Sequence, residues 1–374
     1  MSGRRDFLRK IALPGLLGAA AYQRGGEGFG AEPVLREEQE GLVRLRRRAM
    51  ACHFETFVRA DEDGALRAAQ EALSLLEPLE QQMSVFRPKS ELSEINRRAF
   101  HEPVSVEKGL FDLLLLAVAL GEQTGGAFDI TARPLIRVWA NAQAEGRAPS
   151  QAEVEAARAL VGLRHLSLDA ARSQVRFRTE GVELDLGAIG KGHAVDRLVE
   201  RLRAAGVEHA LVHGGFSSIR AIGTAADGEG WTVSVRHPLA KARPDEAPGA
   251  GATPRTNDRL PAEAARVRLR EQAMSTSAAR RPATPAGGGG ERHLIDPRTS
   301  LAVEGILSAT AFAPTAAAAE ALSTAFCIMG AENAKLYCAS RPEVSGLLFL
   351  PGEHGGAVQV VSIGAEHKDV EVLI

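Results

Sequence analysis

One stretch of the sequence constrains the fold more than any other, because it combines an acidic residue, a glycine-rich turn and the start of a helix. Residues 183–196 read ELDLGAIGKGHAVD, and apolar residues then continue at helical spacing at Val195, Leu198 and Leu202. A strand, a tight turn and a helix N-terminus in this order can hold an anion, because backbone N–H groups and the helix dipole point toward it. Lys191 would add a full positive charge. The stretch therefore predicts an anion-binding turn or, alternatively, a turn that needs its glycines for packing.

The glycine spacing of this turn is G-x-x-G-x-G, and it matches neither of the common phosphate-binding loops. The dinucleotide fingerprint requires G-x-G-x-x-G, and a P-loop requires a glycine where Asp185 stands. The turn alone therefore does not identify its ligand.

Seven segments, in the same order along the chain, resemble the motifs of the ApbE family, the flavin transferases that move FMN from FAD onto a protein hydroxyl. They are residues 86–96, 125–135, 185–196, 213–215, 274–277, 293–299 and 320–325. The resemblance implies a single large α+β domain, related to the T-fold, with mixed sheets and packed helices. It also implies that the protein binds FAD as a substrate.

The same resemblance implies a metal site. The family's ligands correspond to Glu320, Thr324 and the backbone carbonyl of Ala188. On a helix, Glu320 and Thr324 would share one face because they are four residues apart. Oxygen ligands completed by water suit Mg²⁺, which can bridge pyrophosphate oxygens. Without the family, an exposed helix charge and a packed threonine would be the simpler interpretation.

Glu320 departs from the family, which normally has Asp at this position. The additional methylene moves the carboxylate by roughly 1 Å, and displacements of that size can cost on the order of 100-fold in rate. We therefore keep three alternatives: a site adapted to Glu, a site that prefers Mn²⁺ or Ca²⁺, and a protein with weakened transfer activity. Further departures are Ala51-Cys52, His193 and Ser300, where the family has Gly-Thr, Tyr and Gly.

The flavin-binding positions suggested by the resemblance are Met50, Phe86, Asn96, Ala127, Phe128, Asp129, Asp185, Lys191 and Ile295. Asn96 could instead be a helix C-cap. His293 is the candidate to deprotonate the attacking hydroxyl, because the unperturbed pKa of histidine lies near working pH. A structural hydrogen-bonding role is the alternative for His293.

The N-terminus resembles a twin-arginine (Tat) signal, with Arg4 and Arg5 followed by Phe-Leu and a short apolar segment. We expect residues 1–31 to be a cleaved signal peptide and residues 32–374 to form the domain, which would act in the periplasm. A disordered N-terminus that happens to carry two arginines is the alternative. No later run approaches 18 apolar residues, so we expect no mature membrane span.

Net charge, cysteine count and local composition limit the kinds of partner and the organisation that we expect for the chain. The net charge is −2, which indicates no basic surface for nucleic acid. Three cysteines suggest no disulfide framework, and whether Cys327 and Cys338 pair stays open. Residues 238–261, rich in Pro, Gly and Ala, predict a flexible insertion.

Periodicity and turn residues predict local elements along the chain. A strand-like segment over 43–59 is followed by a helix that Pro78 interrupts. Further predictions are a buried helix over 110–120, a helix over 151–160, a hairpin over 165–178, and strands over 210–213 and 231–235.

Taken together, we expect a Mg²⁺-dependent FAD:protein FMN transferase that modifies a Ser or Thr hydroxyl of an exported acceptor protein and releases AMP. A flavin-binding protein with weakened catalysis, or an FAD pyrophosphatase of the same fold, is the alternative.

Overall fold

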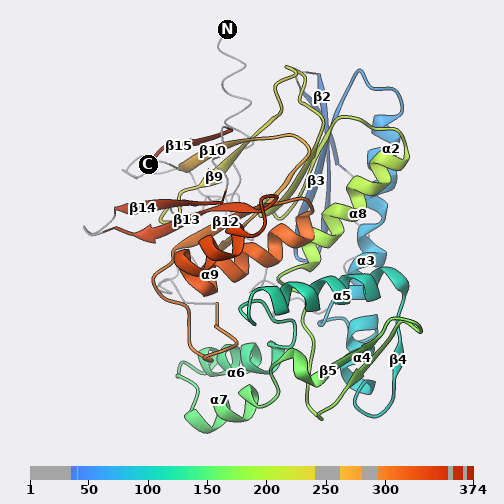
Figure 1. The fold of residues 1–374 in the computed structure, drawn as a ribbon. Coiled ribbons are helices and arrows are strands. Elements are labelled where there is room, and N and C mark those ends of the chain that lie inside the picture. The colour runs from blue at the N-terminus through green and yellow to red at the C-terminus, as the bar shows by residue number, and fades with distance from the viewer. Residues whose placement is uncertain (1–34, 40, 241–261, 280–293, 353–356, 365–368) are drawn as a thin grey trace.

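A nine-stranded sheet forms the centre of the computed structural model, which describes residues 35–39, 41–240, 262–279, 294–352, 357–364 and 369–374 (Figure 1). The strands lie in the order β1-β2-β3-β7-β8-β11-β12-β13-β14, and each described pairing in this sheet is antiparallel. In that order, their bounds are Leu35–Gln39, Leu42–Ala49, Cys52–Arg59, Ala210–Gly214, Ser218–Ile222, Ala273–Ala278, Ser308–Ala313, Ser345–Pro351 and Val358–Ile363.

The predicted strand-like segment over 43–59 is a tight hairpin of β2 and β3. Ala49 pairs with Cys52, so that Met50 and Ala51 form a two-residue turn. Both turn residues have positive φ, 49° and 58°, as a type I′ turn requires. Such turns favour Asn and Gly, so this one holds two residues in a sparsely populated conformation. The turn brings Met50 and Cys52 to the end of the sheet nearest the candidate site.

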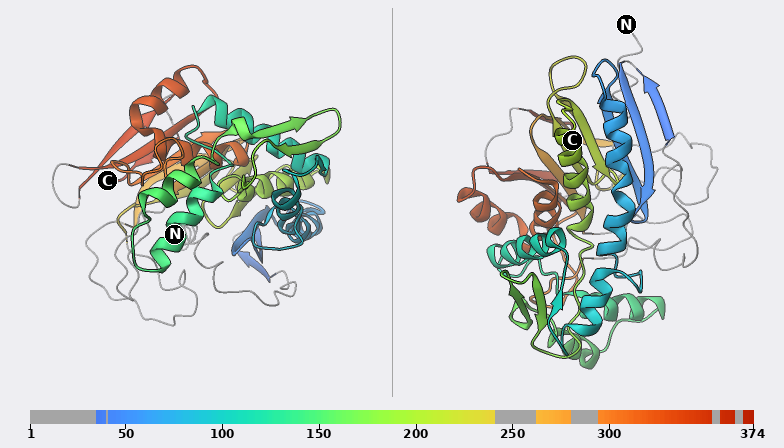
Figure 2. Two further views of the ribbon diagram at one scale, coloured as in Figure 1. Left: turned by 90° about the horizontal axis from the view of Figure 1, so that it is seen from below. Right: turned by 90° about the vertical axis from the view of Figure 1, so that its right-hand side faces the viewer.

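Helices cover one face of this sheet. Helix α8 (Gly190–Ala204) packs on β7 and β8, and α9 (Ala316–Ala339) packs on β11 and β12. Helix α2 (Ala65–Ser74) lies against β3 and α8. Figure 2 shows α2 and α8 side by side along the sheet. Phe54 and Val58, four residues apart on β3 and therefore on the same face, enter this helix-covered core.

A second, three-stranded sheet covers the opposite face. Its order is β15-β10-β9, with bounds Val370–Val372, Glu263–Leu269 and Trp231–Arg236. Phe57 and Leu211 of the large sheet meet Trp231 and Val233 of β9 in a separate buried cluster. The protein is therefore layered as helices, large sheet and small sheet, which confirms the α+β prediction.

Smaller elements form the end of the molecule shown at the bottom of Figure 1. The third sheet has the order β4-β6-β5, and helices α3 to α7 and the 3₁₀ helix η2 complete this region. The bounds of β4, β6 and β5 are Val104–Ser105, Gln174–Phe177 and Leu166–Asp169; those of α3, α4, α5, α6, α7 and η2 are Leu76–Met83, Glu91–Arg98, Lys108–Gln123, Arg133–Ala144, Gln151–Arg158 and Leu163–His165.

Most of the local predictions are confirmed here. Helix α5 contains the predicted buried segment, α7 begins at a capping box formed by Ser150 and Glu153, and β5 and β6 form the predicted hairpin. The prediction that Pro78 interrupts a helix is wrong. The boundary between the two helices lies at Leu75 instead. Pro78 is in the first turn of α3, where its missing N–H needs no helical partner.

The remaining predictions concern the three cysteines, a membrane span and segments that lie outside the described residues. Cys52, Cys327 and Cys338 are all free thiols, which answers the question of their pairing. Within the described ranges, no helix combines the length and the hydropathy needed to cross a bilayer. The predicted signal peptide, residues 241–261 of the predicted insertion and His293 lie outside the described residues.

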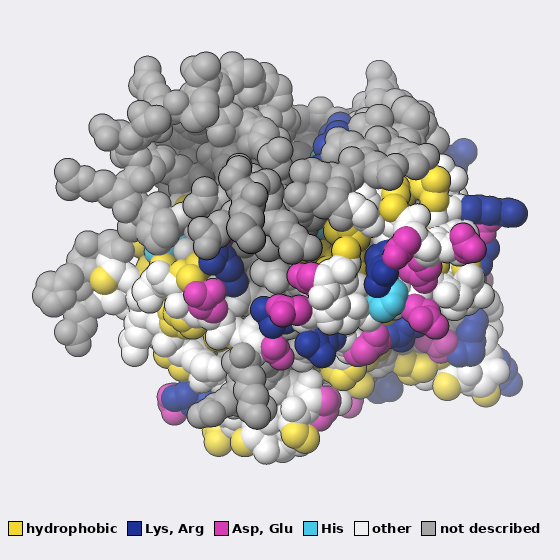
Figure 3. Space-filling view, turned by 90° about the horizontal axis from the view of Figure 1, so that it is seen from above, with side chains coloured by type: hydrophobic (Ala, Val, Ile, Leu, Met, Phe, Trp, Pro, Cys, Tyr) yellow, Lys and Arg dark blue, Asp and Glu magenta, His cyan; other side chains and the backbone are white. Residues whose placement is uncertain are grey.

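The molecular surface at the end shown in Figure 3 mixes charges of both signs. Lys and Arg side chains lie among Asp and Glu side chains over the described part of this face. That part of the surface therefore has no extended area of a single charge.

Candidate active site

The glycine-rich turn has the predicted local geometry, but the segment before it is not a sheet strand. Asp185 Oδ1 accepts the Gly187 N–H at 2.7 Å, and the Leu186 carbonyl accepts the Gly190 N–H at 2.7 Å. Helix α8 begins at Gly190, one residue before Lys191. The backbone of Leu184 is held instead by the side chain of Asn96, through Nδ2 to the Leu184 carbonyl at 3.0 Å and from the Leu184 N–H to Oδ1 at 2.7 Å.

The Asn96 side chain therefore makes the two backbone hydrogen bonds to Leu184 that a neighbouring strand would otherwise make. It lies within α4 (Glu91–Arg98), so the alternative that it is a helix C-cap is wrong. Its Oδ1 and Nδ2 atoms both take part in bonds to Leu184. A contact of Asn96 with the cofactor stays a prediction.

Two helices meet next to the turn at a close contact. A methyl group added at Gly192 of α8 would lie 2.2 Å from the carbonyl oxygen of Ala316 in α9. Asp196, one turn further along α8, accepts the N–H groups of Ala316 and Ala317 at 2.9 Å each. These two N–H groups have no acceptor within their own helix, so Asp196 caps the N-terminus of α9. Arg220 pairs with the same carboxylate at 2.5 Å.

This contact places Glu320 of α9 at the start of α8. Glu320 is 4% exposed, and its Oε2 accepts the Gly192 N–H at 2.7 Å. Its Oε1 forms an ion pair with Lys191 Nζ. Burial acts to lower the pKa of Lys191, but the charge and hydrogen bond of Glu320 outweigh it, so the pKa is raised. Lys191 is therefore fully charged, and the structure brings together two residues that the sequence assigned to different roles.

The predicted neighbour of Glu320, Thr324, lies on the same helix face. Thr324 Oγ1 is 3.3 Å from the Glu320 carbonyl and 3.1 Å from the hydroxyl of Ser277 in β11. The turn contributes a further oxygen, because Lys191 Nζ also lies 3.5 Å from the carbonyl of Gly187, the residue before Ala188. The Glu320 acid and the Gly187 carbonyl thus both contact Lys191, and the Thr324 hydroxyl lies one helical turn beyond Glu320.

These oxygens are suitable for a hard divalent cation. No group of three or more His, Cys, Asp or Glu residues that could hold a metal occurs within the described ranges. A site here would therefore use one carboxylate, one hydroxyl, a carbonyl and water, which is the ligand set that Mg²⁺ accepts. The residues present fit the predicted ion, and the ligation itself stays a prediction.

Cys52 and Gly215 form one wall beside Lys191. Gly215 has φ of 60°, and a methyl group there would lie 3.2 Å from Cys52 Sγ and 3.8 Å from Lys191 Cδ. Burial raises the pKa of Cys52 to about 12, so the thiol is neutral. The strand that leads to Gly215 is held by His213 Nε2, which lies 3.1 Å from Glu55 Oε2 in a buried pair.

Phe86 and Arg133 lie at the other end of the turn. Phe86 is 47% exposed, and the guanidinium of Arg133 lies 5.5 Å from its ring centroid. Arg133 also pairs with Asp185 at 3.0 Å and with Glu183 at 3.1 Å. A continuous series of contacts therefore runs from Phe86 through Arg133, Asp185 and the turn to Lys191 and Glu320. This series of contacts has an exposed aromatic ring at one end and a largely buried ion pair at the other.

Met50 is held at the border of this region by a buried acid. Its N–H donates to Glu80 Oε2 at 3.0 Å, and Arg87 pairs with the same oxygen at 3.2 Å. Glu80 is therefore what fixes the strained turn of Met50 and Ala51.

The remaining predicted residues are placed in the protein interior or at its border. Ala127 and Phe128 are buried in the main core. Asp129 Oδ1 accepts the N–H and the hydroxyl of Thr131, and burial raises the pKa of Asp129. Ile295 packs in a small cluster with Leu135 of α6. Their contacts in the protein are structural, and their contacts with a cofactor stay predictions.

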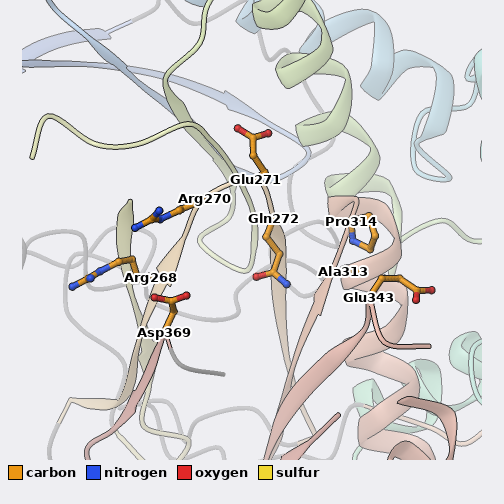
Figure 4. Close-up of a pocket in the computed structure, with 8 residues that line it drawn as sticks. All are labelled: Arg268, Arg270, Glu271, Gln272, Ala313, Pro314, Glu343 and Asp369. Carbon is orange, nitrogen blue, oxygen red and sulfur yellow. The ribbon is translucent and has the colours of Figure 1, made fainter. Parts of the chain in front are cut away.

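A surface pocket of about 330 Å³ is separate from this site. It is lined by Arg268, Arg270, Glu271, Gln272, Ala313, Pro314, Glu343 and Asp369 (Figure 4). Arg268 and Arg270 project toward the same side of it. None of the residues that the sequence assigned to a site lines this pocket.

Sequence reasoning missed four residues that organise the site: Arg133, Glu80, Ser277 and Ser323. Arg133 and Ser277 lie within the segments that resemble the family, but only the fold shows what they face. Glu80 gave no signal, because an acidic residue in an amphipathic helix is normally solvated.

Comparison with known proteins agrees with this geometry. A sequence model described as the ApbE family matches residues 50–348. The FAD:protein FMN transferase of Treponema pallidum is 30% identical over 298 residues, which cover 76% of this chain and 77% of that protein. The one from Escherichia coli K12 is 29% identical over 290 residues, covering 75% and 77%.

Solved structures show the same fold. The ApbE protein of Thermotoga maritima is 26% identical with a TM-score of 0.69, covering 85% of this chain and 96% of that one. The flavin transferase ApbE from Vibrio cholerae is 23% identical with a TM-score of 0.69, covering 88% and 98%.

Proposed function

Because the chain belongs to the ApbE family, we propose that it uses the junction of the glycine-rich turn, α8 and α9 to transfer FMN from FAD to an acceptor protein. The protein is a transferase, FAD is its substrate, and a protein is its acceptor. The observation that carries the choice of site is the buried Glu320, which shares the N-terminus of α8 with the charged Lys191.

The reaction needs alignment and charge neutralisation more than covalent help from the enzyme. A Ser or Thr hydroxyl of the acceptor attacks the phosphorus on the FMN side of the diphosphate. The new bond joins that oxygen to phosphorus, the bond from phosphorus to the AMP oxygen breaks, and the hydroxyl proton passes to a base. AMP leaves. Negative charge must be held on the diphosphate oxygens throughout.

Lys191 and the N-terminus of α8 would hold this charge. The ammonium is kept protonated by Glu320, and the helix N-terminus favours anions. Glu320, Thr324 and the Ala188 carbonyl would hold Mg²⁺, which supplies further charge neutralisation when it is bound. Phe86, Met50, Ala127 and Phe128 would border the flavin, as the resemblance to the family implies.

The identity of the base and the cellular location rest on the sequence. His293 remains our candidate to receive the proton, and an exported acceptor with a Ser/Thr-containing segment remains the proposed partner. Arg4 and Arg5 support export by the twin-arginine route to the periplasm.

The test uses the full chain with FAD, Mg²⁺ and an acceptor protein carrying an Asp-x-x-Ser/Thr-Gly-Ala-Thr segment. Covalent flavin fluorescence on the denatured acceptor is followed together with AMP release. We expect equal amounts of labelled acceptor and AMP, and loss of both in Glu320→Gln. Release of AMP with free FMN would instead identify a pyrophosphatase. Binding of FAD without turnover, also with Mn²⁺, would identify a flavin-binding protein.

A further inference from the structure

Two hydroxyl groups, those of Ser277 and Ser323, connect the side chain of Thr324 to the backbone carbonyl of Glu320. Ser323 Oγ donates to the Glu320 carbonyl at 2.9 Å. Ser277 Oγ lies 2.8 Å from Ser323 Oγ and 3.1 Å from Thr324 Oγ1. Ser277 comes from β11 and the other two from α9, so this cluster joins the sheet to the helix that carries the proposed metal ligands.

The direction of these hydrogen bonds follows from the number of protons. Each hydroxyl has one proton to donate. Because Ser323 donates to the Glu320 carbonyl, the proton between Ser323 and Ser277 must come from Ser277. The proton between Ser277 and Thr324 must then come from Thr324. The relay runs from Thr324 through Ser277 and Ser323 to the Glu320 carbonyl.

One other arrangement competes with this direction. Thr324 could donate to the Glu320 carbonyl, but that distance is 3.3 Å, and the carbonyl already accepts from Ser323 at 2.9 Å. The shorter contact to Ser277 is the better hydrogen bond.

We propose that Ser277 is a positioning residue: its Oγ accepts a hydrogen bond from the Thr324 hydroxyl and thereby leaves the lone pairs of Thr324 Oγ1 available to the cation. The inference rests on the proposed function, because it presupposes that Thr324 is a metal ligand. A hydroxyl that binds a metal through a lone pair needs an acceptor for its proton, and partners of this kind commonly change metal affinity by 10- to 100-fold. Ser277 is the acceptor that the fold supplies.

The neighbouring residue provides a matched control. Thr276 lies on the same strand and makes one hydroxyl contact, 2.8 Å to Thr310 on β12. Because successive side chains of a strand point to opposite faces, Thr276 is directed away from α9. Thr276→Ala therefore removes one hydroxyl–hydroxyl contact from the same strand and leaves the relay intact.

The experiment measures Mn²⁺ binding to the full chain by electron paramagnetic resonance, with no turnover required. We expect Ser277→Ala to raise the Mn²⁺ Kd about 10-fold, Thr276→Ala to change it less than about twofold, and Ser277→Thr, which keeps the hydroxyl, to restore it. Added to Thr324→Val, Ser277→Ala should have no further effect, because the relay then has no ligand to orient. If Ser277→Ala does not fold, Ser277→Cys gives the same comparison with a poor acceptor.

The outcomes separate the two levels of the proposal. Unchanged Mn²⁺ binding in both Glu320→Gln and Thr324→Val would contradict the metal site itself. Weakened binding in those two variants, with Ser277→Ala equal to Thr276→Ala, would overturn only the role of Ser277. Additive effects of Ser277→Ala and Thr324→Val would overturn it as well, because Ser277 would then act independently of Thr324.

Discussion

Gly192 donates its backbone N–H to Glu320 Oε2 at 2.7 Å, and its Cα faces the first turn of the helix that carries this acid. The hydrogen bond and the close approach depend on each other, because α9 can present Glu320 to α8 only where α8 has no side chain. The packing of α8 on α9 and the position of the Glu320 carboxylate therefore both depend on Gly192.

Gly192→Ala should therefore disturb both properties. The added methyl group would lie 2.2 Å from the Ala316 carbonyl, so the helices must move apart. We expect a loss of about 1–3 kcal/mol in the free energy of unfolding and weaker Mn²⁺ binding, measured by denaturant unfolding and by titration. Gly190→Ala is the control, since its methyl group would be 3.8 Å from its nearest neighbours. Equal destabilisation by both substitutions would contradict this account.

Glu320→Asp tests whether the site is adapted to glutamate. Both oxygens of Glu320 have partners, Lys191 and Gly192, that a shorter side chain cannot reach together without movement of α9. A shift of roughly 1 Å can cost on the order of 100-fold in rate, so we expect transfer activity to fall on this scale, measured as labelled acceptor per unit time. Higher activity in Glu320→Asp would show instead that glutamate weakens the natural enzyme.

Arg133→Gln should reduce the affinity for FAD, measured by fluorescence titration without acceptor. The substitution removes the cation next to the Phe86 ring and leaves Asp185 without its ion pair. A cation–π contact at a partly exposed site contributes about 0.5–1 kcal/mol, so we expect the Kd to rise about two- to fivefold. Arg137→Gln is the matched control, because Arg137 lies on the same helix and pairs with the same acid, Glu183. The same change in both variants would argue against a role for Phe86.

The buried imidazole of His193 should lower the free energy of unfolding in acid. Burial, assisted by the charge of Arg197, lowers its pKa to about 4, whereas the unfolded chain has a value near 6.5. The unfolded state thus binds more protons between these values, and stability falls as the pH decreases from about 6.5 to about 4. At pH 5 the loss from this group is about 2 kcal/mol. In His193→Tyr the difference in unfolding free energy between pH 7 and pH 5 should shrink by that amount, and in His101→Tyr, at an exposed site, it should not.

Much of the local structure could be predicted from sequence because its causes are local. The periodicity of α8, the Ser150 cap of α7 and the spacing of Glu320 and Thr324 each depend on residues a few positions apart. Pro78 was misjudged because proline is excluded only from helix interiors, and the position of the helix start was decided elsewhere.

The contacts within the site could not be predicted in this way. Lys191 was expected to meet phosphate and Glu320 to meet a metal, yet their ion pair depends on how α8 crosses α9. Asn96 holds a backbone segment 88 residues away, and Ser277 faces Thr324 only because β11 lies under α9. Family resemblance supplied the candidate residues, and tertiary packing supplied their partners.

The arrangement of the central sheet has a consequence for synthesis of the chain. Strand β3 pairs with β7, and Gly192 meets an acid 128 residues later. A nascent polypeptide, made from its N-terminus, cannot assemble this junction until α9 has emerged from the ribosome. During that interval α8 lacks its partner, and its apolar face is open to chaperones and proteases. The site that we propose for FAD can therefore form only after α9 has been synthesised.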